Sequence, residues 1–467
     1  MKQNKMDART DSRLAGSFRD PSGFIFKHDD TLFRQVNLAY RDDYDYLIDS
    51  GLYRNLVDSD LLVPHEESSH PPVNPDIAYK VIEPKKIDFI SYPYEWCFSQ
   101  LKDAALATLE IHKRAFEYGM ILKDASAYNI QFDNGRPVLI DTLSFEKYRD
   151  GEPWVAYSQF CRHFLAPLAL MRYRDIRVGQ LLRVNLDGIP LDMASTLLPW
   201  RTKLSFSLMT HIHLHAGSQK HFESKRVNAS NGKMKPRAML GLIDSLETAV
   251  KKLNWRPGKS VWGNYYQDNH NNYDDTALNH KQELVSRYID MASPRMLWDL
   301  GANNGRFSRI AADKGVQTIA FDLDYTAVEE DYQKNTRAGD KRILPLVLDL
   351  ANPSAGIGWE HRERMSLLER APADTVMALA LVHHLAIGNN LAFDQIAHFF
   401  HEAGRHLIIE FVPKDDSQVQ FMLSSRRDIF HDYNRETFEK EFSAYFDIEQ
   451  SEMIMNTKRN LYLMTRR

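Results

Sequence analysis

The segment MLWDLGANNGRFSRIAADKG, residues 296–315, has a pattern that few folds accommodate. Residues 296–300 predict a strand, the run Gly301-Ala302-Asn303-Asn304-Gly305 predicts a tight turn, and a helix follows. Glycines in such a turn permit positive φ angles and the close approach of a ligand, and the following helix N-terminus favours electron-rich groups. The segment therefore predicts the strand–turn–helix unit of a nucleotide-binding α/β domain.

The next strand narrows the kind of nucleotide. It reads QTIAFD and ends in Asp322, which lies 21 residues after Gly301, and an acid at this spacing can accept hydrogen bonds from two ribose hydroxyls. A dinucleotide fingerprint that starts at Gly301 needs glycines at positions 303 and 306, where this chain has Asn303 and Arg306. The loop therefore argues against a dinucleotide-binding site. The pattern that the loop does contain is Asp-x-Gly-x-x-x-Gly, with Asn303 at its middle position. Asparagine tolerates the left-handed conformation nearly as well as glycine does.

This loop resembles the first motif of class I S-adenosylmethionine-dependent methyltransferases. The resemblance continues through LPLVLDLANP, DTVMALALVHHL and RHLIIEFVP, which look like the third to fifth strands of that family, and through FDIEQSEM and NLYLMTRR, which look like its closing antiparallel pair. It implies a Rossmann-like sheet with S-adenosylmethionine as cofactor. The residues that it assigns to cofactor binding are Asp299, Gly301, Asn303, Gly305, Asp322, Leu323, Asp349, Leu350 and Ala380.

The resemblance also implies roles within this set. Asp299 and Gly301 would approach the methionine moiety, Asp322 the ribose, Asp349 with Leu350 the adenine, and Ala380 the sulfonium. An ordinary α/β domain with carboxylates at its strand ends is the alternative interpretation.

The methyl acceptor needs a base if its nucleophile is a hydroxyl or an ammonium group. His383 and His384 follow the fourth strand, at the mouth where acceptors bind in such folds, and are the candidate catalytic residues. Packing or simple substrate contact is the alternative for both, and Glu410, at the end of the fifth strand, is a further candidate. The Asn-Pro-Pro-Tyr type of motif is absent from the sequence, which argues against methylation of DNA amino groups.

A second signal lies in GMILKDASAYNIQFDNGRPVLIDTLSFE, residues 119–146. Its Asp-x₄-Asn … Ile-Asp pattern resembles the catalytic and metal-binding loops of protein kinases and aminoglycoside-type phosphotransferases. By that resemblance Asp124 would be the base, Asn129 and Asp141 the metal ligands, and Mg-ATP a second ligand. No glycine-rich loop precedes this segment, and Arg34 and Lys80 are both guesses for the phosphate-anchoring cation. We therefore expect a kinase-like, two-lobed pseudokinase module, with an active kinase or an unrelated α+β domain as alternatives.

The N-terminal half also predicts local elements. FIFKHDDTLFRQV predicts a hairpin, residues 43–62 a helix, and residues 94–118 a long amphipathic helix that stops at Gly119. AYKVI and IDFISY predict a second pair of strands.

A length of 467 residues with 43% hydrophobic residues predicts a folded chain of more than one domain. We expect a disordered lead-in at 1–20, the kinase-like module at 21–216, a linker with a helical connection at 217–259, and the methyltransferase domain at 260–467. Within the linker, residues 218–237 are basic and predict either a solvated connection or a phosphate-contacting loop.

Charge and cysteine content limit the partners and the compartment. The chain has 59 Lys and Arg against 63 Asp and Glu, a formal net charge of −4, which argues against nucleic acid and anionic membranes as partners. No stretch of about 18 apolar residues is present. Two cysteines cannot form a disulfide framework, so we expect a cytoplasmic protein. We expect no metal site in the segment with His211, His213, His215 and His221, because their alternate spacing does not suit a helical background.

Most of the chain, including YPYEWCFSQLKDAALATLEIHKRA and FCRHFLAPLAL, resembles the bacterial group related to nodulation protein NoeA. The resemblance implies a methyltransferase but supplies no acceptor. We expect an enzyme that methylates an O or N nucleophile of a small molecule, a glycan or a protein, with the N-terminal module aiding recognition. A bifunctional kinase–methyltransferase and a non-catalytic nucleotide-ligand-binding protein are the alternatives.

Overall fold

The computed structural model describes residues 12–215, 234–258 and 273–467. The chain divides into two compact units, which are described separately. The first comprises Met1–Tyr94, Gln100–Trp255 and Gly356–Arg364, and the second comprises Glu95–Ser99, Arg256–Ala355 and Met365–Arg467. Most of the predicted lead-in and of the basic stretch lies outside the described residues. The predicted domain boundaries stay a prediction.

The first unit contains a five-stranded antiparallel sheet in the order β1-β2-β3-β5-β4. The predicted hairpin is confirmed, since β2 pairs with β3 around a turn at Asp29. The predicted second strand pair is wrong, because β5 pairs with β3 and β4 instead of with IDFISY. The backbone of that segment is held by a side chain: Gln131 accepts a hydrogen bond from Ser91 N at 2.8 Å and donates one to Ser91 O at 2.9 Å. The strands are β1 (Ser12–Arg13), β2 (Gly23–His28), β3 (Thr31–Asn37), β4 (His65–Ser68) and β5 (Ala78–Pro84).

Helices make up most of the rest of this unit. The single helix predicted over residues 43–62 is two helices, α1 (Arg41–Asp49) and α2 (Leu52–Asp58), because Gly51 between them has a φ of +84°. The long predicted helix is confirmed as α3 (Phe98–Glu117). The other helices are α4 (Tyr157–Phe160), α5 (Ala166–Tyr173), α6 (Leu181–Val184), α7 (Leu191–Leu197), α8 (Phe206–Leu208) and α10 (Pro236–Lys252).

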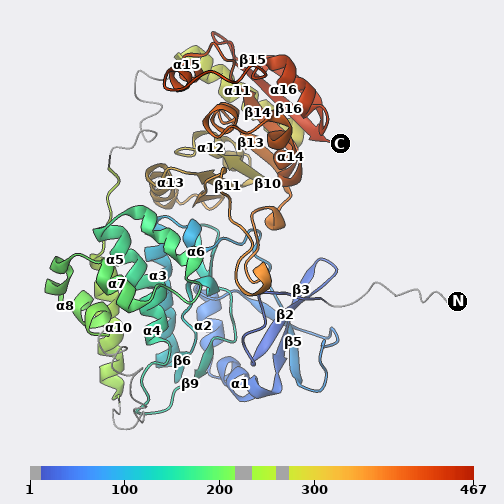
Figure 1. Cartoon of the computed structure of the whole chain (residues 1–467). Helices are drawn as coiled ribbons and strands as arrows, with labels where there is room; N and C mark the ends of the chain where they lie inside the picture. The colour runs from blue at the N-terminus through green and yellow to red at the C-terminus, as the bar shows by residue number, and fades with distance from the viewer. Residues whose placement is uncertain (1–11, 216–233, 259–272) are drawn as a thin grey trace. The chain divides into compact units, whose positions relative to one another are not determined.

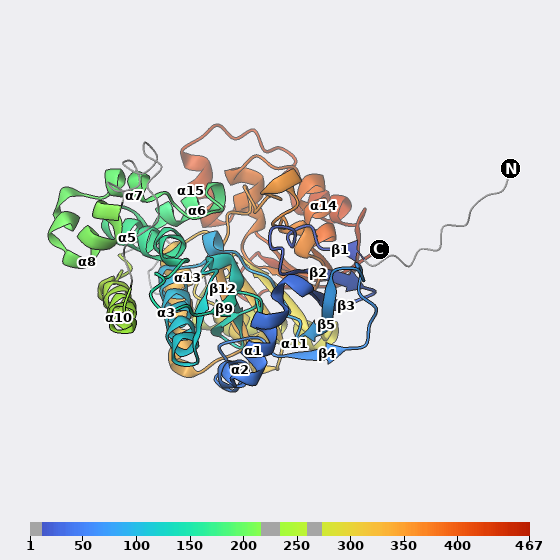
Figure 2. The same ribbon diagram turned by 90° about the horizontal axis from the view of Figure 1, so that it is seen from below.

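Two further short strand pairs follow α3. They are β6 (Met120–Leu122) with β9 (Phe145–Lys147), and β7 (Ile130–Asp133) with β8 (Arg136–Leu139). The five-stranded sheet lies on one side of α3, and α5, α7 and α8 lie on the other (Figures 1 and 2). The kinase-like assignment of this unit is not confirmed and stays a prediction.

The second unit is built on a seven-stranded sheet with the order β12-β11-β10-β13-β14-β16-β15. Its first five strands are parallel, and β16 is antiparallel to both β14 and β15. The predicted Rossmann-like sheet and its closing antiparallel pair are therefore confirmed. The strands are β10 (Met296–Leu300), β11 (Gln317–Asp322), β12 (Ile343–Val347), β13 (Ala373–Ala378), β14 (Gly404–Phe411), β15 (Phe446–Met453) and β16 (Asn460–Arg466).

Helices cover both faces of this sheet. Residues of α11 and α12 share one core cluster with the strand residues Leu297, Met377 and Ile408. Rings of α14 and α16 pack on the other face, where Phe438 lies 5.0 Å from Phe411 between ring centroids. The helices are α11 (Asp275–Ala292), α12 (Arg306–Asp313), α13 (Tyr325–Ala338), α14 (Phe393–Ala403), α15 (Ser417–Ser424) and α16 (Arg435–Phe442).

The order of strands reverses at β10, which has β11 on one side and β13 on the other. In open α/β sheets, ligands bind outside the carboxyl ends of the strands at such a switch point. The fold therefore directs attention to the ends of β10, β11, β12 and β13.

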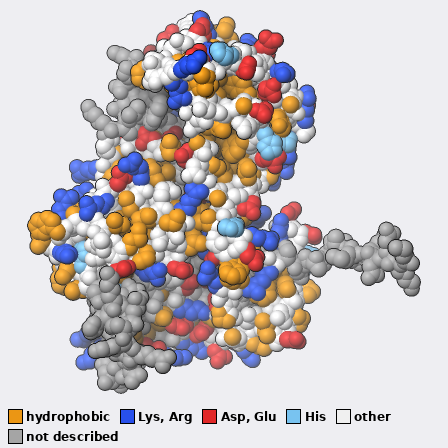
Figure 3. Space-filling model, in the orientation of Figure 1, with side chains coloured by type: hydrophobic (Ala, Val, Ile, Leu, Met, Phe, Trp, Pro, Cys, Tyr) orange, Lys and Arg blue, Asp and Glu red, His pale blue; other side chains and the backbone are white. Residues whose placement is uncertain are grey.

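Two properties of the surface complete the description. No helix among the described residues is long and apolar enough to cross a membrane. Acidic and basic side chains are interspersed over the face seen in Figure 3.

Candidate functional site

The loop after β10 has the geometry that its glycines predict. Gly301 has a φ of +81°, Asn303 of +51° and Gly305 of +71°. The backbone N–H groups of Gly301 and Ala302 both donate to Phe321 O at 2.9 Å, which ties the loop to β11. Asn303 can adopt its positive φ because asparagine tolerates the left-handed conformation.

Asp322 is held by backbone donors on both of its carboxylate oxygens. Oδ2 accepts from Asn303 N at 2.7 Å, and Oδ1 accepts from Asp324 N at 2.8 Å. Burial nevertheless raises the pKa of Asp322 to about 6, because these backbone hydrogen bonds offset only part of the desolvation. The carboxylate is thereby fixed in orientation, and its oxygens keep lone pairs for a ligand.

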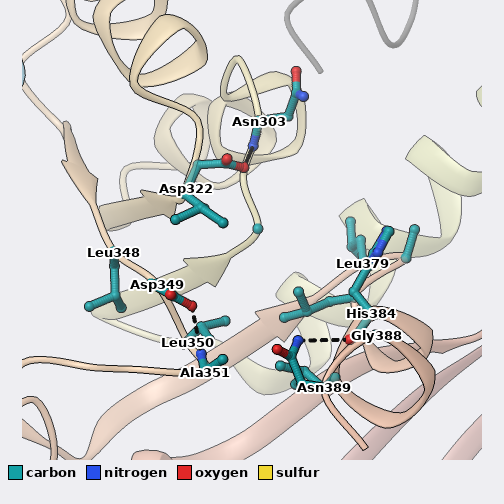
Figure 4. A pocket seen from close by; sticks show the side chains of 15 residues that line it. Asn303, Asp322, Leu348, Asp349, Leu350, Ala351, Leu379, His384, Gly388 and Asn389 are labelled. Carbon is teal, nitrogen blue, oxygen red and sulfur yellow. Dashed lines mark hydrogen bonds between the residues drawn. The ribbon is translucent and has the colours of Figure 1, made fainter. Parts of the chain in front are cut away.

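The ends of β10 to β13 enclose a cavity of about 300 Å³. Figure 4 shows Asn303 and Asp322 on one side of it and His384, Gly388 and Asn389 on another, with Asp349 hydrogen-bonded to Ala351 N between them. Carboxylates, apolar side chains and a histidine share the lining. The lining residues are Gly301, Asn303, Asp322, Leu323, Leu348, Asp349, Leu350, Ala351, Leu379, Ala380, Leu381, His384, Leu385, Gly388 and Asn389.

The structure brings most of the predicted cofactor residues together at this cavity. Asp299 and Gly305 are the two that do not line it. Asp299 is buried and accepts a hydrogen bond from Ser308 Oγ at 2.6 Å, and burial raises its pKa to about 7. A Cβ at Gly305 would lie 2.5 Å from both carboxylate oxygens of Asp331, so this glycine is a packing requirement of the loop.

Sequence reasoning missed several apolar residues of the lining and one short helix. Leu348, Leu379 and Leu381 flank predicted residues and could have been found by extending each strand end by one position. Gly388 and Asn389 belong to the turn that ends a π-helix, His384–Gly388, and no sequence pattern marks that conformation.

The two candidate catalytic histidines differ in position. His384 lines the cavity, whereas His383 is 2% exposed and its Nδ1 has no hydrogen-bond partner among the described residues. Their rings lie 4.2 Å apart between centroids. Burial lowers the pKa of both side chains, and the nearby Arg459 lowers them further, so both rings are neutral at physiological pH.

Glu410 belongs to a buried charge network and does not line the cavity. Its carboxylate pairs with Lys281 Nζ at 2.6 Å and with Arg459 Nη1 at 3.3 Å. Arg459 also pairs with Asp416 at 2.8 Å. Burial opposes ionisation of Glu410, but the two cations outweigh it and hold the pKa below its ordinary value. Glu410 is therefore a structural anion, which does not suit the role of general base.

In the first unit, Asp124 and Asp141 bind protein groups. Asp124 Oδ1 accepts from Ser126 N at 2.9 Å and from Gln159 Nε2 at 2.8 Å. Asp141 forms a largely buried ion pair with Arg34, whose side chain is 12% exposed. Burial opposes ionisation of Asp141, but Arg34 and neighbouring hydrogen bonds lower its pKa overall.

The third residue of this pattern, Asn129, donates to Ser144 Oγ at 3.4 Å. Ser144 Oγ in turn donates to Asp141 at 2.5 Å. The predicted metal ligands are thus linked to each other through a serine, and a guanidinium supplies the positive charge.

Among the described residues, no group of three or more His, Cys, Asp or Glu side chains is placed so that it could hold a metal ion. Both ring nitrogens of His211 contact hydroxyls, of Tyr157 at 2.7 Å and of Ser245 at 2.9 Å. His213 likewise contacts Ser195 at 2.8 Å and Thr202 at 2.9 Å.

Comparison with solved structures gives only weak likenesses. Magnesium protoporphyrin IX methyltransferase ChlM from Synechocystis PCC 6803 with bound SAH is 18% identical over 44% of this chain and 93% of that chain, with a TM-score of 0.33. WbdD is 16% identical over 44% of this chain and 43% of that chain, with a TM-score of 0.30. The fold itself is defined by the order of the strands in the seven-stranded sheet. No protein-family model matches the chain.

Comparison with curated proteins gives a full-length relative. Nodulation protein NoeA of Rhizobium meliloti (strain 1021) is 37% identical over 463 residues, which cover 97% of this chain and 96% of NoeA. The match spans nearly the whole length of both chains. The chain therefore belongs to the NoeA family.

Proposed function

We propose that the chain is an S-adenosylmethionine-dependent methyltransferase that acts on an O or N nucleophile of a small-molecule, glycan or protein acceptor. The observation that carries the proposal is Asp322, a half-buried carboxylate at the end of β11, oriented by two backbone N–H groups and facing a cavity at the switch point of the sheet. A carboxylate in this place suits the two hydroxyls of a ribose.

The lining fits the rest of the cofactor by its chemistry. Leu348 and Leu350 offer apolar surfaces for an adenine ring, and Asp349 an acceptor for its amino group. Leu379, Leu381 and Leu385 exclude water from the part of the cavity nearest β13. When bound, S-adenosylmethionine supplies an electrophilic methyl group on sulfur.

His384 is the residue that we assign to the acceptor. Because its ring lines the cavity and is neutral, it can accept a hydrogen bond from an acceptor hydroxyl and take up its proton. The ring of His383 lies beside it, tilted by 38°, without reaching the cavity, so we assign His383 to positioning. Asn389 Nδ2 donates to His384 O at 3.0 Å and supports the same turn.

We assign the first unit to recognition of the acceptor. The ion pair between Arg34 and Asp141 places a side-chain cation where a metal would have to bind, which argues against Mg-ATP. The competing proposal is a kinase–methyltransferase, which would bind Mg-ATP at the first unit.

Calorimetry on the full chain tests these assignments. We expect binding of S-adenosylmethionine and S-adenosylhomocysteine, and Asp322→Asn should weaken both by roughly a hundredfold, because two charge-assisted hydrogen bonds are lost. Asp313→Asn, an exposed acid on α12, is the matched control and should leave the affinity unchanged.

The absence of binding at millimolar concentration, or equal affinity of Asp322→Asn and the unaltered chain, would refute the proposal. Titration with Mg-ATP should give no heat. Mg-ATP binding that disappears in Asp141→Ala would favour the kinase–methyltransferase instead.

A further inference from the structure

A protruding tip lies in the first unit, in the short helical turn Trp200–Leu204 and the adjoining α8. Trp200, Leu204 and Phe206 are 74%, 77% and 81% exposed. Three large apolar side chains within seven residues are therefore almost fully in solvent. Figure 3 shows hydrophobic side chains gathered at the edge of the molecule where Figure 1 places α8, with Lys and Arg side chains beside them.

Cations accompany these apolar side chains. Arg201 and Lys203 alternate with them along the chain and are exposed. The guanidinium carbons of Arg201 and Arg172 lie 5.8 Å and 5.7 Å from the centroid of the same Tyr173 ring. Within the part of the chain that the structure describes, none of the three cations takes part in an ion pair. Residues 199–206 contain no acidic residue, so the tip carries net positive charge.

The base of the tip is held in place from within. Thr202 is 1% exposed, and its Oγ1 donates to Pro199 O at 2.7 Å and contacts His213 Nε2 at 2.9 Å. Ser195 Oγ contacts the other ring nitrogen of His213 at 2.8 Å. The outward side chains therefore project from an anchored backbone, which lowers the ordering cost of any contact that they make.

We propose that this tip inserts into the headgroup region of a membrane that contains anionic phospholipids. Side chains that are more than about three-quarters exposed do not pack on one another, so the tip presents separate points instead of a flat or concave patch. A protein partner would need a matching pocket for each point, whereas a fluid interface accepts them without one. Tryptophan and phenylalanine favour that interface, and Arg and Lys are attracted by anionic headgroups.

The proposal differs from the expectation drawn from composition. A net charge of −4 describes the whole chain, and the absence of a spanning helix concerns insertion across a bilayer. Neither describes a local surface, and peripheral binding needs only exposed apolar side chains and a few neighbouring cations. The proposal is independent of the methyltransferase assignment.

Co-sedimentation of the full chain with vesicles tests it. The probes are vesicles of phosphatidylcholine alone and of an equimolar mixture with phosphatidylglycerol. We expect binding to the mixed vesicles that weakens as salt is raised. Trp200→Ser/Phe206→Ser should lower the partition constant at least tenfold, and Arg201→Gln/Lys203→Gln roughly fivefold for each cation removed.

The control is Phe421→Ser, which removes an equally exposed aromatic ring from α15 and should leave binding unchanged. Unchanged thermal midpoints of all variants would show that loss of binding is not unfolding. The proposal is overturned if the chain sediments with neither kind of vesicle, or if the tip variants bind as the unaltered chain does. It is equally overturned if sedimentation velocity without lipid shows a dimer that Trp200→Ser/Phe206→Ser dissociates, since the tip would then bind a second copy.

Discussion

At the level of single residues, two carboxylates with raised pKa values lie at or near the cavity: Asp322 lines it, and Asp299 lies buried behind it. Asp322 and Asp299 lie at the ends of neighbouring strands, and burial raises their pKa values to about 6 and about 7. Raised pKa values of this kind cluster at functional sites, where the fold tolerates a charge for the sake of a ligand. Varying the pH, which changes the ionisation of these two carboxyl groups, therefore tests their roles.

Ligand affinity should depend on pH through Asp322. Ribose hydroxyls donate to the ionised carboxylate, so affinity should be highest above pH 7 and fall as pH drops through about 6. At pH 5 only about a tenth of such a group is ionised, which predicts a loss of roughly tenfold in S-adenosylhomocysteine affinity. Calorimetry between pH 5 and pH 8 measures it, and Asp322→Asn should flatten the profile. Equal affinity at both ends would contradict the assignment.

Asp299 should make the protein less stable as pH rises, whereas Asp322 should make ligand binding stronger as pH rises. Because its pKa is raised from 3.8 to about 7 in the folded chain, its contribution to stability is present below pH 4 and is lost as pH rises through 7. Asp299→Asn should therefore increase the free energy of unfolding at pH 8, by up to roughly 4 kcal/mol, and change it little at pH 4. Denaturant unfolding at the two pH values measures the difference, with Asp313→Asn as a control that shows none. Destabilisation at pH 8 would mean that the hydrogen bond from Ser308 outweighs the cost of burial.

Some residue-level features could be predicted from the sequence and others could not. Asp322 was predictable because it ends a strand at a fixed spacing from the glycine turn, whereas Asp349 was predicted only through the family resemblance. It was not predictable that His384 lines the cavity and His383 does not. The two residues are adjacent after a strand, and a π-helix that no sequence pattern marks begins at His384. The pairing of Arg34 with Asp141 joins positions 107 residues apart, and no local pattern contains it.

At the scale of elements, the turn between β10 and α12 depends on one packed glycine. Gly305 and Gly339 both have positive φ, of +71° and +67°, and both precede or end a helix. A Cβ at Gly305 would lie 2.5 Å from the buried Asp331 carboxylate and from Arg309, whereas nothing lies within 4 Å at Gly339. Substitution at Gly305 therefore adds both a steric clash and backbone strain, whereas substitution at Gly339 adds backbone strain alone.

Gly305→Ala should destabilise the chain by roughly 3 kcal/mol or more, since it adds a clash with a buried ion pair to the left-handed strain. Gly339→Ala should cost about 1 kcal/mol, the strain alone. Thermal and denaturant unfolding measure both. Equal losses would show that the loop relaxes away from Asp331.

The parallel strands and the long helix α3 were predictable because their apolar periods are strong. Strand β4 was not, since His65–Ser68 reads HEES and shows no apolar alternation. It is a strand because β5 offers it an edge, which is a tertiary cause. The same limit applies to the break at Gly51, where a continuous helical pattern hides a positive φ.

At the scale of the whole molecule, the cavity draws every lining residue from the second unit. S-adenosylhomocysteine should therefore slow amide hydrogen exchange in peptides that cover residues 299–305, 320–326, 347–352 and 379–390. Peptides of residues 20–94 and 100–215 should be unaffected. Exchange measured by mass spectrometry with and without ligand tests this, and Asp322→Asn at the same ligand concentration should remove the protection. Protection confined to the first unit would place the ligand elsewhere.

The backbone at Ala380 has a consequence for how this protein would evolve or be engineered. Ala380 lines the cavity with a φ of +50°, a conformation that alanine adopts only at a cost of about 1–2 kcal/mol. Glycine would relieve that cost, so Ala380→Gly is the kind of change that a screen for heat resistance selects. Ala380 and Asp322 both line the cavity, and burial raises the pKa of Asp322, so a search for more stable variants will tend to change the cavity first. Such a search should be run with the ligand present. Because a bound ligand stabilises the folded chain, variants that still bind it are then favoured.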